Sequence, residues 1–145
     1  WSLSQKGMLK PVMREVNLLG VAKEAVGSVR GQDVITVDIP ENLIVLTDRN
    51  MLLTILRNLL DNAVKASQHS DIPGAPVILR SEATKDLLHA RQIVIIDNGL
   101  GLREEAPEWG HGLGLVITRE LLDKLCARME MHNRPEGGLQ ITIDL

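Results

Sequence analysis

The longest helical repeat in the chain runs through residues 51–67, MLLTILRNLLDNAVKAS. At about 100° per residue, its apolar side chains fall on one broad face. These side chains are Leu52, Ile55, Leu56, Leu59, Leu60 and Ala63. Asp48 is a good N-cap, so we expect a helix from about Arg49 to Ser67. A helix with so wide an apolar face needs a second layer to cover it.

The other periodic segments predict what that second layer is. Helical spacing recurs over 17–30, opened by Asn17 as N-cap, and over 112–127. Runs of strand type occupy 34–39, 43–48, 77–83, 91–97, 129–133 and 139–145. We expect the first two of these strands to form a hairpin around Pro-Glu-Asn, and the last two to form a closing hairpin. Because βαβ repeats are few, the pattern predicts a two-layer α/β (α+β) sandwich, with a mixed, mostly antiparallel sheet covered on one face by about three helices.

The length of 145 residues suits one domain. We assign that domain to residues 17–145. Residues 1–16 fit neither period, and we interpret them as the remnant of a preceding linker. The chain has no Phe or Tyr and only two Trp, so its core must be aliphatic. We expect its one cysteine, Cys126, to pack inside the helical pattern of 112–127.

Charge and hydropathy exclude several classes of partner. A net charge of -3 gives no basic field for a nucleic acid or for an anionic membrane surface. No apolar run approaches the roughly 20 residues that cross a bilayer, and the first residues lack the apolar core of a signal peptide. We therefore expect no nucleic-acid partner, no direct membrane contact by this domain and, by default, a cytoplasmic location.

The polar face of the long helix carries two asparagines, Asn58 and Asn62, one turn apart. A solvated face is the ordinary reading, but Asn is a poor helix former and its repetition calls for a function. An amide oxygen suits Mg²⁺ when phosphate oxygens and waters complete the octahedron. Lys65, a further turn on, can meet a phosphate as a point charge.

Two glycine-bearing stretches offer further binding chemistry. In IVIIDNGLG, Asp97 ends a strand and is followed by Gly99 and Gly101. A plain tight turn is the alternative, but the following LREEAPEW is not a returning strand, and a strand-end carboxylate can accept a hydrogen bond from an adenine amino group. GHGLGL then places glycines at a helix start, where free amides attract phosphate. Those glycines are Gly110, Gly112 and Gly114.

The glycine triplet alone is weak, since it lacks the Lys-Ser/Thr of a P-loop and follows a loop instead of a strand. Taken in order, however, the three motifs resemble those of the gyrase-like, Hsp90-like, histidine-kinase and MutL ATPases, which share the Bergerat fold. NLLDNAVKAS is similar to their N box, DNGLG to their G1 box and GHGLGL to their G2 box. The element order from Asn17 to Leu145 most resembles that of bacterial sensor histidine kinases.

The resemblance implies ATP and Mg²⁺ as cofactors and a role for each matching residue. Asn62 would hold Mg²⁺ with help from Asn58, Lys65 would lie near phosphate, and Asp97 would bind the adenine amino group. Gly99 and Gly101 would shape the base pocket. The hinge of the ATP lid and the phosphate-binding helix start would be formed by Gly110, His111, Gly112, Leu113 and Gly114.

As a kinase of this type, the chain would present the ATP γ-phosphate to a histidine on a separate helical dimerisation domain, and a response regulator would act downstream. The fragment alone would not phosphorylate itself. The parent protein could be anchored in the inner membrane.

Some positions depart from the family pattern. Ala66 stands where many relatives have an aromatic residue, and no F box exists in a chain without Phe. Only eight residues, LREEAPEW, separate the G1 and G2 motifs. These departures favour an alternative, a degenerate domain that binds nucleotide weakly or not at all and acts through protein contacts. A hydrolysing ATPase is less favoured, because Thr54 stands where some relatives carry Glu.

Overall fold

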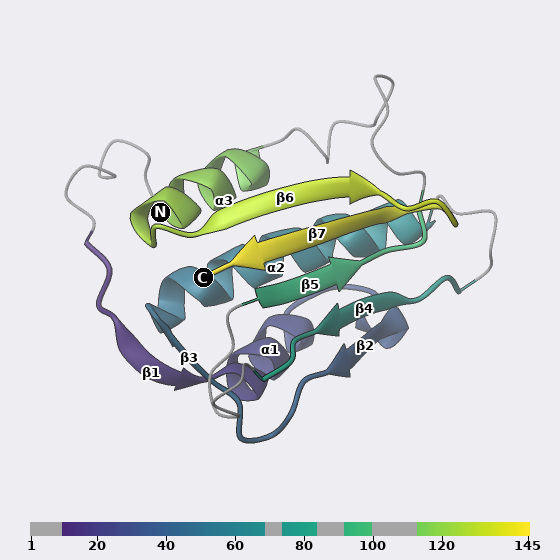
Figure 1. Cartoon of the computed structure of the whole chain (residues 1–145). Helices are drawn as coiled ribbons and strands as arrows, with labels where there is room; N and C mark the ends of the chain where they lie inside the picture. The colour runs from purple at the N-terminus through teal and green to yellow at the C-terminus, as the bar shows by residue number, and fades with distance from the viewer. Residues whose placement is uncertain (1–9, 69–73, 84–91, 100–112) are drawn as a thin grey trace.

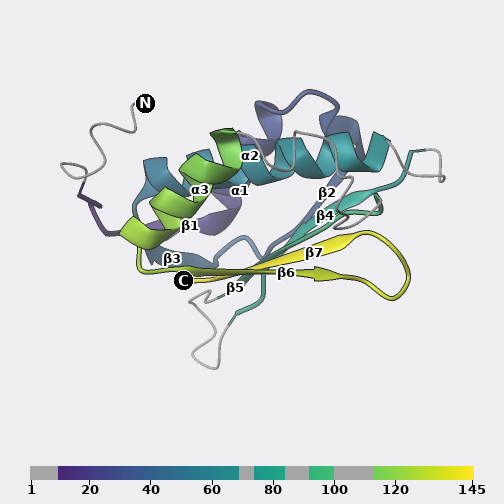
Figure 2. The same ribbon diagram turned by 90° about the horizontal axis from the view of Figure 1, so that it is seen from above.

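The computed structural model describes residues 10–68, 74–83, 92–99 and 113–145. Within these ranges the chain forms two layers, helices on one side and a sheet on the other (Figures 1 and 2). The helices are α1 (Leu18–Gly27), α2 (Arg49–Gln68) and α3 (Leu113–Lys124), with a short 3-10 turn at Gln32–Val34. The strands are β1 (Arg14–Asn17), β2 (Ile35–Asp38), β3 (Ile44–Thr47), β4 (Val77–Arg80), β5 (Gln92–Ile96), β6 (Arg128–Asn133) and β7 (Leu139–Asp144).

The main sheet has the order β2-β4-β5-β7-β6. Its β2–β4 pair is parallel, and its other pairs are antiparallel. In Figure 2 the three helices lie together over one face of this sheet. The structure therefore confirms the predicted fold class, a mixed and mostly antiparallel sheet under a layer of helices.

The core between the layers is aliphatic, as the composition requires. All six apolar residues predicted on the inner face of α2 are buried. The sheet meets them with cross-strand pairs, Ile93 opposite Ile143 and Ile95 opposite Ile141, all four of them buried. Alternate residues on the same strands, such as Val94 and Thr142, are only partly buried. This alternation fixes the register, because a slip of one residue would turn the isoleucines out of the core.

The predicted hairpin between 34–39 and 43–48 is wrong. β2 pairs in parallel with β4, with Ile35 opposite Val77, whereas β3 pairs with β1. Pro-Glu-Asn does form an exposed turn, closed by a hydrogen bond of 3.3 Å from the Leu43 amide to the Pro40 carbonyl, but the strands on its two sides pair with different partners. Alternation within a strand identifies the strand but not its partner, and that is where the prediction failed.

Strand pairing begins before Asn17, within residues 1–16. β1 begins at Arg14, and the buried Val16 stands opposite Val45 of β3. The ordered pairing therefore starts three residues before Asn17. Asn17 itself caps α1 as predicted, because its Oδ1 accepts a hydrogen bond of 2.9 Å from the amide of Gly20.

Cys126 is exposed, contrary to the prediction that it packs in the core. The regular helix ends at Lys124, so the helical spacing no longer applies at this position. Cys126 has a φ of 55° and donates from its amide to the Asp123 carbonyl, while the Ala127 amide donates to Leu122. This is the left-handed closure of a helix end, which turns the chain towards β6. None of the described helices has the length and apolar character needed to cross a bilayer.

The first turn of α2 depends on Asp48. Its Oδ1 accepts from the Met51 amide at 3.0 Å, and its Oδ2 accepts from the Val12 amide at 2.8 Å. We expect Asp48→Ala to lower the free energy of unfolding by about 1 to 2 kcal/mol, because the cap and the tie to Val12 are both lost. Asp48→Asn keeps one acceptor oxygen and should lose less. Urea denaturation of the two variants measures the difference, and equal losses would contradict this role.

Candidate functional site

The first part of the site is the contact between α2 and the start of α3. The Asn58 Nδ2 donates to the Gly114 carbonyl at 3.3 Å and to the Thr118 Oγ1 at 3.4 Å. Thr118 is fully buried and donates from its hydroxyl to the same Gly114 carbonyl at 2.8 Å. These bonds fix the first turn of α3 on α2. They use the nitrogen of the Asn58 amide, so its oxygen is the atom that can still accept a ligand.

Asn62 lies one helical turn further along α2. It is partly buried, and its side chain forms no hydrogen bond with another described residue. Asn58 is also partly buried, so both asparagines lie where the polar face of α2 borders its apolar face. A polar amide at the edge of the core and without a partner in the described ranges is suited to binding a ligand.

Lys65 does not stand alone on this face. Its Nζ lies 2.8 Å from an Asp61 carboxylate oxygen, and the two side chains are 49% and 42% exposed. An exposed ion pair of this spacing contributes little to stability, because water screens it. The ammonium can therefore move to a phosphate at small cost, although the structure itself places it against Asp61.

The second part of the site is Asp97, which follows the last residue of β5. It is only 3% exposed, and its Oδ1 accepts from the Gly99 amide at 2.9 Å and from the Leu139 amide at 3.1 Å. Burial raises the pKa of Asp97 above its usual value, and the two amides and the Arg134 guanidinium oppose that rise. Both amide bonds end on Oδ1, which leaves Oδ2 as the oxygen that can meet a ligand.

Gly99 brings these two parts together. A Cβ at this position would lie 2.6 Å from the Ala66 carbonyl oxygen, so only glycine allows the loop after β5 to approach α2 this closely. Ala66 is one turn beyond Asn62 on the same helix. The Asn98 Nδ2 also donates to the Pro76 carbonyl at 2.8 Å, which holds the loop from its other side. The strand-end carboxylate and the asparagine face of α2 are thereby fixed relative to each other.

The remaining predicted residues are described only in part. Leu113 is the first residue of α3, and Gly114 follows it on top of Asn58, with the position of a Cβ 3.6 Å from the Asn58 Cγ. The other four positions lie outside the described residues. They are Gly101, Gly110, His111 and Gly112.

Sequence reasoning missed several residues that shape the site, among them Thr118, Arg134, Gly138 and the amide of Leu139. Thr118 lies within an apolar helical stretch of the sequence. That position is the signal that could have indicated a buried hydroxyl. The Gly-Gly pair before β7 was read only as a hairpin turn. Nothing in the sequence showed that this turn touches Asp97.

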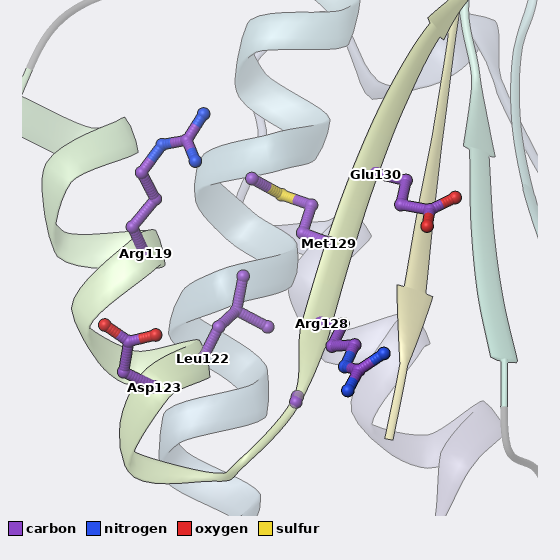
Figure 3. Close-up of a pocket in the computed structure, with 7 residues that line it drawn as sticks. Arg119, Leu122, Asp123, Arg128, Met129 and Glu130 are labelled. Atoms are coloured by element: carbon purple, nitrogen blue, oxygen red, sulfur yellow. The ribbon is translucent and has the colours of Figure 1, made fainter.

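A groove of about 430 Å³ lies elsewhere, between the C-terminal half of α3 and the start of β6 (Figure 3). Leu122 and Met129 point between the two elements, with Arg119, Asp123, Arg128 and Glu130 around them. None of the predicted site residues lines it. We therefore do not connect this groove with the site at Asn58, Asn62 and Asp97.

Comparison with known sequences places the chain in a family. Residues 47–145 match the family described as histidine kinase-, DNA gyrase B- and HSP90-like ATPase. The match spans α2, the loop after β5, α3 and the closing β6–β7 hairpin, the elements that carry the site. The chain therefore belongs to this ATPase family, as its motifs predicted.

Individual relatives are sensor kinases. The chain is 30% identical to the sensor protein kinase CarS of Pseudomonas aeruginosa over 112 residues, 73% of this chain and 25% of that protein. It is 32% identical to the swarming motility regulation sensor protein RssA of Serratia marcescens over 126 residues, 77% of this chain and 26% of that protein. The chain thus spans about a quarter of the length of these relatives.

Solved structures agree on the fold. The mycobacterial sensor histidine kinase MprB superposes with a TM-score of 0.72 at 24% identity, covering 92% of this chain and 97% of that one. The Acinetobacter baumannii histidine kinase AdeS gives a TM-score of 0.73 at 20% identity, covering 99% of this chain and 72% of that one. The fold is the one seen in these histidine kinases.

We expect Gly99→Ala to lower the free energy of unfolding by about 2 kcal/mol, because the new methyl group would overlap the Ala66 carbonyl. Gly27→Ala is the matched control, since nothing lies within 4 Å of a Cβ there, and it should be neutral or stabilising by about 0.5 kcal/mol. Thermal or urea unfolding separates the two outcomes. A Gly99→Ala protein as stable as the Gly27→Ala protein would show that the loop does not depend on this contact.

Proposed function

We propose that the chain is the ATP-binding catalytic domain of a two-component sensor histidine kinase. In this role it binds Mg-ATP and presents the γ-phosphate to a histidine on a separate helical dimerisation domain. The observation that carries the proposal is the juxtaposition at Gly99, where a buried strand-end carboxylate and a helix face with two asparagines are locked together. Membership of the ATPase family and the sensor-kinase relatives support it.

The donor set fits a magnesium-bound triphosphate. Amide oxygens of Asn62 and Asn58 are ligands that Mg²⁺ accepts, provided that phosphate oxygens and waters complete the shell. When bound, Mg²⁺ would neutralise charge on the phosphates. The bonds from Asn58 to α3 keep the start of that helix beside the metal-binding face, so its free amides can meet phosphate oxygens. Lys65 can exchange Asp61 for a phosphate.

The donor set also fits an adenine base. Asp97 keeps its position through Oδ1, and Oδ2 can accept a hydrogen bond from the exocyclic amino group of adenine. Burial excludes water from this bond and makes it selective, because a base with a carbonyl at the same place would face a carboxylate without a proton between them. Catalysis by the domain then consists of positioning and charge neutralisation.

The proposal extends to the whole protein. We infer that a response regulator receives the phosphoryl group, that the domain works on the cytoplasmic side, and that the longer parent is anchored in the inner membrane. The sensor-kinase relatives, of which this chain spans a quarter, support these inferences.

Calorimetric titration with Mg-ATP tests the nucleotide site. We expect binding by the unaltered chain, and affinity at least about tenfold weaker in Asn62→Ala and in Asp97→Asn, because each variant loses one recognition group. Asn50→Ala and Asp38→Asn, at exposed positions, are controls that should bind normally. Absence of binding by the unaltered chain would instead favour the degenerate domain that acts through protein contacts.

Asp97→Asn should lose binding without losing the fold. The asparagine keeps an oxygen for the Gly99 and Leu139 amides but turns an amide donor towards the adenine amino group. The folded-state pKa of Asp97 is raised. Its favourable contribution to the free energy of unfolding is therefore present at low pH and is lost as pH rises through that pKa. The raised pKa of Asp97 thus counts against stability at pH 7, and we expect the variant to melt no lower than the unaltered chain there. A clearly lower melting temperature would contradict this.

We expect the chain alone to take no phosphoryl group from radiolabelled Mg-ATP. The described histidine, His132, lies on β6 with its side chain 62% exposed, on a strand and not on a helical hairpin. Label should appear only when a histidine-bearing helical dimerisation domain is supplied. Acid-labile label on the isolated chain would refute the separation of the two domains.

A further inference from the structure

We propose that the turn between β6 and β7 is the part of the domain that positions Asp97 for adenine, and that Arg134 is its positioning residue. The inference rests on the proposed nucleotide site and adds a residue to it. In Figure 1 this turn lies beside the end of β5, where Asp97 follows. The pairing of β5 with β7 continues there through the Asp97 amide, which donates to the Leu139 carbonyl at 3.0 Å.

Arg134 reaches from the turn to the loop that carries the carboxylate. Its Nη1 donates to the Asp97 carbonyl at 3.3 Å and to the Asn98 Oδ1 at 3.2 Å. The side chain is only 19% exposed, so these bonds are largely shielded from water. One guanidinium nitrogen therefore holds the main chain of Asp97 and the side chain of its neighbour together.

Gly138, at the other end of the turn, packs against the loop that carries Asp97. It is buried, with a φ of 83°, and a Cβ there would overlap the Asp97 carbonyl. The turn itself is closed by bonds of 3.0 Å from the Gly137 amide to the Arg134 carbonyl and from the Arg134 amide to the Gly138 carbonyl. Arg134 and Gly138 thus face each other across the turn, and both meet the Asp97 carbonyl.

This arrangement fixes the direction of the Asp97 side chain. Its Oδ1 is held by the Leu139 amide directly beyond Gly138, and its own carbonyl is held by Arg134. Because its Oδ1 and its main-chain carbonyl are both held, Asp97 presents Oδ2 in one direction. A carboxylate oxygen held in this way selects a base by its exocyclic group. If Arg134 only stabilised the hairpin, its removal would weaken all nucleotides alike. A positioning role predicts a change in base selectivity.

The test compares Mg-ATP with Mg-ITP, whose base has a carbonyl in place of the amino group. We expect Arg134→Ala to lower ATP affinity about five- to tenfold, because a hydrogen-bonding cation is lost from the loop, and to change ITP affinity less than about twofold. Arg134→Lys should recover part of the ATP preference. Glu136→Ala removes the exposed partner that lies 3.0 Å from the other Arg134 nitrogen and should leave both affinities within about twofold.

A glycine pair gives a second test that does not depend on Arg134. Gly137 and Gly138 both have positive φ, but nothing lies within 4 Å of a Cβ at Gly137. Alanine at either site strains the backbone, whereas only Gly138→Ala pushes against Asp97. We expect the ATP to ITP preference to fall in Gly138→Ala and to persist in Gly137→Ala, with circular dichroism confirming that both variants fold.

The outcomes separate this inference from the proposed function. Unaltered protein that binds neither nucleotide would overturn both the proposed function and this inference. Unaltered protein that prefers ATP, with Arg134→Ala and Gly138→Ala keeping the same preference, would overturn this inference alone. A loss of ATP and ITP affinity in equal measure would reduce Arg134 to a structural role and would also overturn it.

Discussion

The site depends on the contact between the loop after β5 and the last turns of α2. At Gly99 the main chain lies against the Ala66 carbonyl with no room for a methyl group. The sheet delivers Asp97 to this point and the helix delivers Asn62 one turn earlier. Neither element carries both kinds of group, so the proposed recognition of base and of phosphate is joined only where the layers touch. A loosening of this contact would separate the two halves of the proposed ligand site.

Much of the fold could be predicted because the signals were local. The wide apolar face of α2 required a covering layer, and Asn17 and Asp48 marked the starts of their helices by capping chemistry. Asn58 and Asn62 lie on the expected helix, and Asp97 directly follows the expected strand. Periodicity and caps act within a few residues, and the printed sequence contains that information in full.

Two of the failures involved contacts distant in sequence, and the third was local to a helix end. The parallel pairing of β2 with β4 could not be read from strand patterns, because alternation is the same for every partner. Cys126 was misplaced because a helix end closed in left-handed backbone left the helical spacing. Arg134, which donates a hydrogen bond to the Asp97 carbonyl, lies 37 positions away in the sequence, and no motif links the two residues. Such contacts arise only when the sheet has assembled.

Asp48 accepts two hydrogen bonds, and this has a structural consequence. One carboxylate holds the incoming chain at Val12 and the opening turn of α2 at Met51. A displacement of the chain at Val12 would therefore act directly on the first turn of α2. Asn58 and Asn62 lie further along the same helix, so the entry of the chain and the proposed site are joined through one element.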